Sequence, residues 1–259
     1  MTKYIPLWTI NKNILTGYRN KKEHKLGCFI SIFNIHNETI NIWTHLLSLS
    51  YFLFVFFKNF NKLNHILTLY EGVSMISFGT STIYHIYMPY TQQWFIILLK
   101  LDVYSIIINI AISNILIFYY WFWCYKEIRD LYMLFSFIYL SIGFTALLNI
   151  DIIKRYNYIL LYFSIYSISI IISYYHINIL TNGNVSEIII YNFSKPFAFY
   201  GIGFIIYAVK MPEKIISNHF DIIGNSHQWW HIFSFLGAYF YHDEIIKYSE
   251  YIQQNNCEY

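Results

Sequence analysis

Three short clusters of polar residues interrupt long apolar stretches of this 259-residue chain. Ionisable side chains are costly inside apolar helices, so such positions are candidates for a functional site. His227 and His231 are four residues apart, a spacing that places two side chains about 6 Å apart on one face of a helix. Ser81 and His85 have the same spacing. In full, the clusters are Ser81 and His85, Lys100 and Asp102, and Ser226, His227, Gln228 and His231.

The three histidines of these clusters form a candidate zinc site. Three neutral imidazoles that converge at one depth can hold zinc with its fourth position open, and no cysteine lies near them in the sequence. Zinc in such a site lowers the pKa of its bound water to about 7, which supplies a nucleophile. A bound hydroxide and the Asp102 carboxylate would balance the charge of the ion. Ser81 would hydrogen-bond a metal ligand, the water or a developing oxyanion.

Each cluster taken alone also has an ordinary structural interpretation. A single histidine at a helix end usually makes a hydrogen bond or lies at an interface, and Asp102 could pair with Lys100. Only the joint placement of His85, His227 and His231 favours a metal site. The other histidines, His45 among them, have no partner at helical spacing and equal depth, so we leave them out of the predicted site.

The composition of the chain is that of a helical membrane protein. Hydrophobic residues make up 57% of the chain and charged residues only 12%, and the mean hydropathy is +0.40. A soluble domain has about 25% charged residues, and a disordered chain needs low hydrophobicity and high charge. The net charge of +3 is too small to indicate a nucleic acid as partner.

Seven apolar segments are long enough to approach the roughly 20 residues that a membrane-spanning helix needs. The predicted fold class is therefore all-α, a seven-transmembrane helical bundle. Short loops join the segments, so consecutive spans cross the membrane in opposite directions. The end of the second span and the starts of the third and seventh therefore lie on the same side. This topology places His85, Asp102, His227 and His231 in one leaflet. The predicted spans are 42–57, 66–88, 95–118, 131–150, 156–175, 188–209 and 227–246.

The basic residues predict the orientation of the bundle. With a cytoplasmic N-terminus, ten lysines and arginines outside the spans lie on the cytoplasmic side and five on the other, as the positive-inside rule prefers. Residues 1–41 are thus predicted to be a basic cytoplasmic segment with a membrane-surface helix. Residues 42–246 form the seven-helix domain of an integral, multi-pass membrane protein, and residues 247–259 form a short tail.

The same clusters, together with an upstream motif, resemble the progestin and adiponectin receptor family, which includes the hemolysin III-related proteins. The upstream motif reads HNETINIWTHL from His36 to Leu46, and its form is similar to the adiponectin-receptor-like branch. The resemblance covers residues 17–242. The other matching residues are Gly17, Tyr18, Arg19, Ser81, His85, Asp102, Tyr104, Tyr207, Met211, Pro212, Glu213, Asp221, Ser226, His227, Gln228 and His231.

The resemblance implies a seven-helix protein with a cytoplasmic N-terminus and zinc held by His85, His227 and His231, with a water near Asp102. Members of the family are associated with receptor signalling, with lipid and zinc homeostasis, and with hydrolysis of ceramide amides. We therefore expect a hydrolase of ceramide or another long-chain lipid amide, in which Asp102 and Ser81 are catalytic. The motif around Glu38 and Asn41 is expected to be structural, a capped helix start whose side chains satisfy the backbone.

Two alternatives to the hydrolase remain. One is a membrane receptor for an unidentified extracellular ligand, in which the zinc is structural and the basic N-terminal segment carries the signal. The other is a hemolysin III-like pore former or transporter, which would need a polar stripe through the whole membrane. The sequence leaves open the substrate, the membrane in which the protein resides and its oligomeric state.

Overall fold

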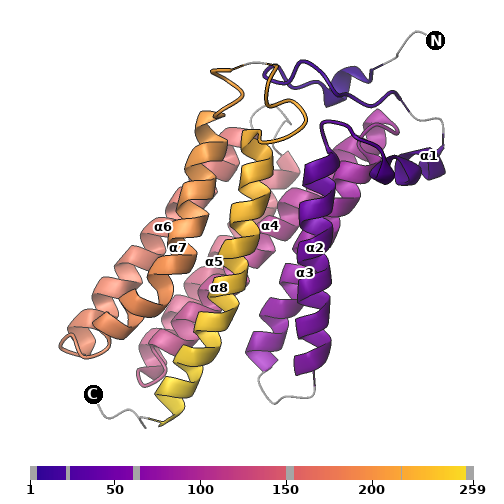
Figure 1. The fold of residues 1–259 in the computed structure, drawn as a ribbon. Helices are drawn as coiled ribbons and strands as arrows, with labels where there is room; N and C mark the ends of the chain where they lie inside the picture. Colours follow the sequence, from indigo (N-terminus) through magenta and orange to yellow (C-terminus); the bar gives the residue numbers. More distant parts are fainter. Residues whose placement is uncertain (1–4, 22–23, 61–64, 150–154, 217, 255–259) are drawn as a thin grey trace.

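The computed structural model describes residues 5–21, 24–60, 65–149, 155–216 and 218–254, and these form an α-helical bundle without strands (Figure 1). Seven long helices make up the bundle. They are α2 (Thr39–Asn59), α3 (His65–Tyr87), α4 (Gln92–Trp121), α5 (Lys126–Asn149), α6 (Arg155–Leu180), α7 (Ser186–Val209) and α8 (Ser226–Gln254). A short helix, α1 (Lys25–Ile30), and two 3₁₀ turns, Leu7–Thr9 and Ser31–Phe33, precede them.

Each of the seven predicted spans coincides with one of the long helices, although the boundaries differ. The largest difference is at the end of α8, which continues to Gln254 rather than stopping near Ile246. This last part of α8 is amphipathic rather than apolar: Tyr248 and Ile252 are buried while Glu250 is exposed. Hydropathy alone therefore ends the helix too early.

Five of the long helices are long and apolar enough to cross a membrane, namely α2, α4, α5, α6 and α7. Helices α3 and α8 are of similar length but carry more polar residues, including all three histidines of the predicted site. Crossing by all seven helices therefore stays a prediction.

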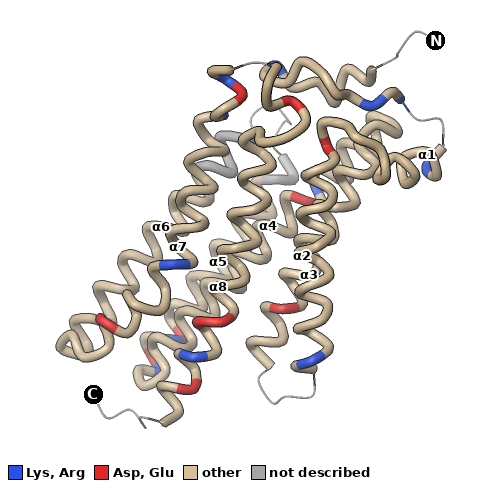
Figure 2. Tube along the Cα trace, viewed as in Figure 1, with Lys and Arg blue, Asp and Glu red and all other residues tan. Residues whose placement is uncertain are grey.

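The outer surface of the bundle is strongly apolar. Large side chains such as Phe135 on α5, Ile171 on α6 and Ile205 on α7 are more than half exposed, and contiguous apolar surface of this kind marks contact with a membrane. Charged positions lie mostly toward the two ends of the bundle (Figure 2). The helices that position the site contact one another: α8 packs against α7 and α2, and α3 packs between α2 and α4.

At the end of α2, α3 and α8 away from α1, a buried carboxylate joins the three helices. The Glu71 side chain on α3 is fully buried and accepts hydrogen bonds at Oε1 from Asn59 Nδ2 of α2, at 2.6 Å, and from His242 Nε2 of α8, at 2.7 Å. A buried polar group needs such hydrogen-bond partners, so this cluster ties the three helices together. The sequence pattern alone does not connect Glu71 with His242.

Candidate metal centre

The last turn of α3 and the first two turns of α8 bring three histidines together at the α1 end of the bundle. One ring nitrogen each of His85, His227 and His231 lies within 4.8 Å of the other two, an arrangement that could hold a metal ion. The Nε2 atoms of His85 and His227 are 3.3 Å apart. With Zn–N bonds of about 2.0–2.1 Å, the edge of a tetrahedron is about 3.3–3.4 Å. The donor set, and the spacing of the His85–His227 pair, are thus compatible with a tetrahedral zinc ion.

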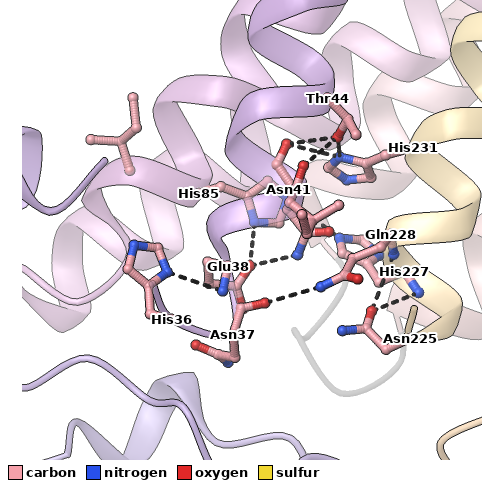
Figure 3. Close-up of polar contacts among 12 residues, drawn as sticks. His36, Asn37, Glu38, Asn41, Thr44, His85, Asn225, His227, Gln228 and His231 are labelled. Atoms are coloured by element: carbon pink, nitrogen blue, oxygen red, sulfur yellow. Dashed lines mark hydrogen bonds and ion pairs between the residues drawn. The ribbon is translucent and has the colours of Figure 1, made fainter. Parts of the chain in front are cut away.

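Hydrogen bonds to the far side of two rings orient them for metal binding (Figure 3). His85 Nδ1 donates to Glu38 Oε2 at 2.8 Å, and His231 Nδ1 donates to the backbone oxygen of Asn41 at 3.2 Å. A proton on Nδ1 leaves the Nε2 lone pair free, and metal-binding histidines generally have such a partner. Both supporting residues come from the start of α2.

Glu38 was expected to cap α2, and this expectation is wrong. Its side chain makes no capping hydrogen bond but reaches across to His85 and also accepts a hydrogen bond from Asn41 Nδ2 at 2.7 Å. Burial raises the pKa of the Glu38 carboxyl, but the hydrogen bond and electrostatic attraction of His85, with smaller effects of Asn41 and His227, outweigh it and lower this pKa to about 2. The carboxylate is therefore anionic at neutral pH. His36 holds the start of α2 instead, since its Nδ1 accepts from the Glu38 backbone N–H at 3.1 Å.

His45 also belongs to the site, although we left it out of the predicted residues. Its ring is buried and stacks on the ring of His231, with a centroid distance of 3.6 Å and an angle of 12°. The residues Glu38, Asn41 and His45 are spaced by three and four positions, which places them on one face of a helix. This polar stripe along α2 is the sequence signal that could have revealed the contribution of α2.

The loop before α8 fixes the turn that carries His227. Asn225 Oδ1 accepts hydrogen bonds from the backbone N–H groups of His227 at 3.2 Å and Gln228 at 3.1 Å, which is the geometry of a helix cap. Glu213 is buried and accepts from both the backbone N–H, at 2.7 Å, and the hydroxyl of Ser226. These hydrogen bonds join the Met211–Glu213 motif of the sequence to the motif that contains Ser226 and His227.

A cavity of about 170 Å³ opens beside the histidines. His227 and His231 line it together with Asp102 of α4 and Ser81 of α3, the two residues that we predicted to be catalytic. Most of the remaining wall is apolar or aromatic, and it includes Leu99, Val103, Ile106, Phe204 and Trp230. The cavity can therefore accommodate an apolar group next to a metal, a carboxylate and a hydroxyl.

Comparison with known proteins gives consistent results. The family model described as haemolysin-III related matches residues 33–242. The chain is 27% identical to an uncharacterised protein of Schizosaccharomyces pombe (96% of this chain, 59% of that protein). It is 26% identical to heptahelical transmembrane protein 1 of Arabidopsis thaliana (88% and 74%) and 24% identical to the adiponectin receptor protein of Drosophila melanogaster (98% and 61%). The chain thus spans about three fifths of the length of the Schizosaccharomyces and Drosophila relatives.

Proposed function

Given that the chain belongs to the haemolysin-III related family, as the sequence motifs predicted, we propose that it is a zinc-dependent hydrolase of long-chain lipid amides such as ceramide. The observation that carries the proposal is the cluster of His85, His227 and His231 beside a cavity that also contains Asp102 and Ser81. Three imidazoles with an open fourth position are the donor set of catalytic rather than purely structural zinc. When bound, zinc would polarise the amide carbonyl and activate a water.

The residues of the cavity have separate roles in this proposal. Asp102 orients the attacking water and accepts its proton, and then delivers a proton to the nitrogen of the amide as the carbon–nitrogen bond breaks. Ser81 hydrogen-bonds the carbonyl oxygen as negative charge develops on it. The apolar wall holds the acyl chain and keeps bulk water away, while Glu38 keeps His85 in the metal-binding tautomer.

We further propose that all seven long helices cross the membrane and that the N-terminus is cytoplasmic. Five helices meet the requirement of length and composition, and the Arabidopsis relative is named as heptahelical. The polar character of α3 and α8 is compatible with crossing, because their polar residues Ser81, His85 and His231 are buried inside the bundle. The distribution of basic residues supports the orientation, and it places the histidine cluster near the cytoplasmic face.

The proposal is tested with purified full-length protein loaded with zinc. We expect close to one zinc per chain and release of fatty acid from ceramide. His231→Ala should lose bound zinc and lower turnover by at least about a hundredfold, since ligand loss removes the metal chemistry. His65→Ala, a histidine at the opposite end of α3, is the matched control and should behave as wild type. Equal turnover by wild type and His231→Ala would refute the hydrolase.

A receptor with a structural zinc is the second candidate, favoured by the name of the Drosophila relative, an adiponectin receptor protein. In this case zinc would bind and raise the melting temperature, because metal binding is linked to folding. His231→Ala would then lower the melting temperature, while neither wild type nor variant would hydrolyse ceramide. The same preparation therefore separates the two functions.

A further inference from the structure

The segment before α1 packs over the α1 end of the bundle. The backbone N–H groups of Leu15 and Thr16 donate to Asp221 Oδ2 at 3.1 and 2.7 Å, and the Thr16 hydroxyl donates to the same atom at 2.8 Å. Gly17, with a positive φ of 79°, turns the chain so that its backbone oxygen accepts from the Asn37 N–H at 2.9 Å. The segment is thus attached to the loop before α8 and to the start of α2.

Arg19 follows this turn and reaches the end of α3. Its Nη2 donates to the backbone oxygen of His85 at 2.5 Å, and its Nη1 donates to the backbone oxygen of Ile86 and to Ser31 Oγ, each at 3.0 Å. The Arg19 residue is only 8% exposed. The sequence places Arg19 in the basic N-terminal segment and among the motif residues, without indicating a role for it, and the structure buries it beside the histidine cluster.

The Arg19 side chain supplies hydrogen-bond donors that the backbone at the end of α3 lacks. The backbone oxygen of His85 would normally accept from the N–H four residues later, but that residue is Pro89, which has no N–H. The last carbonyl groups of a helix also carry partial negative charge, which a cation stabilises. Burial lowers the pKa of Arg19 to about 10, with the nearby Glu38 opposing this shift, so the guanidinium is charged at neutral pH.

We propose that Arg19 is a positioning residue of the metal centre, because it fixes the backbone of His85 through the carbonyl group that Pro89 leaves without a donor. The inference rests on the proposed metal site but concerns a residue outside its ligand set. His85 is consequently held at two points, its ring by Glu38 and its backbone by Arg19. The N-terminal segment is then part of the metal centre rather than a separate tail.

The test compares Arg19→Gln and Arg19→Lys with wild type, and Lys25→Gln is the matched control. Lys25 also lies in this region, but its ammonium stacks on the Trp94 ring at 4.1 Å. We expect Arg19→Gln to weaken zinc binding about tenfold in competition with a chelator, as loss of outer-shell support does in other sites. Arg19→Lys retains the charge but lacks the planar fork of the guanidinium that meets both carbonyls, so it should weaken binding by a smaller factor. Lys25→Gln should bind as wild type does.

Two further readouts separate positioning from general stability. Cobalt(II) in place of zinc should show an altered visible spectrum in Arg19→Gln, since the geometry of the three imidazoles changes. In metal-free protein, backbone amides at the end of α3 should exchange hydrogen faster in the variant, while those of α5 should not. The inference would be overturned if both Arg19 variants had the zinc affinity, the cobalt spectrum and the amide exchange of the wild type. If Arg19→Gln does not fold, the measurements on Arg19→Lys decide the inference. If purified wild type contains no zinc, the proposed function is refuted. Amide exchange in the metal-free protein then still tests whether Arg19 fixes the end of α3.

Discussion

At the scale of single residues, Glu38 shows how a neighbouring side chain selects the tautomer of a proposed metal ligand, His85. Its carboxylate fixes the proton of His85 on Nδ1 at a distance of 2.8 Å. Substitution by glutamine keeps the size of the side chain but removes its charge, and the amide group no longer selects one tautomer of the imidazole.

We therefore predict that Glu38→Gln weakens zinc binding about tenfold. Chelator competition on purified protein measures this change. Glu187→Gln, at an exposed glutamate in the first turn of α7, should leave the zinc affinity unaltered. A Glu38→Gln affinity equal to that of wild type would show that the contact with His85 does not support the metal.

At the scale of helices, the Glu71–His242 pair makes the side-chain contact between α3 and α8 sensitive to single substitutions. Both side chains are buried, so neither can find water when the other is removed. Removing one partner of a buried pair typically costs about 3–5 kcal/mol, whereas replacing both by apolar residues can be nearly neutral.

His242→Phe is thus expected to lower the free energy of unfolding by about 3 kcal/mol, because it leaves the Glu71 carboxylate buried with one partner fewer. The double variant Glu71→Leu with His242→Phe should be more stable than His242→Phe alone. Denaturant unfolding in detergent micelles measures both. His176→Phe, on α6, is the control for loss of an imidazole elsewhere. A double variant less stable than the single one would contradict the pairing.

Hydropathy predicted the helices well, because burial in lipid demands long apolar segments whatever the tertiary contacts are. Topology also predicted that His85 would lie near His227, since the direction of each helix follows from the number of crossings. The contacts of Glu38, His45 and Arg19 were not predictable in this way. They join segments that are distant in the sequence and depend on side-chain direction, about which a hydropathy pattern contains no information.

At the scale of the whole molecule, the number and direction of the spans decide which compartment the metal centre faces. An odd number of crossings places the two ends of the chain on opposite sides of the membrane, and the basic residues favour a cytoplasmic N-terminus. The sequence Asn37-Glu38-Thr39 matches the N-glycosylation sequon, and with this orientation it lies on the side that the glycosylation machinery does not reach.

We predict that protease added to sealed microsomal vesicles removes an N-terminal tag and leaves a C-terminal tag intact. Detergent should expose both tags, which is the control for vesicle integrity. Removal of the C-terminal tag from sealed vesicles, or a glycan on Asn37, would contradict this orientation.

Helix α8 supplies an imidazole to each of the two buried clusters, His231 at one end and His242 at the other. Eleven residues are close to three full turns, so the two rings point in nearly the same direction about 16 Å apart along the helix axis. Any rotation of α8 about its long axis must swing both rings through the same angle. A rotation of α8 would therefore move His231 of the histidine cluster and His242, the partner of Glu71, together.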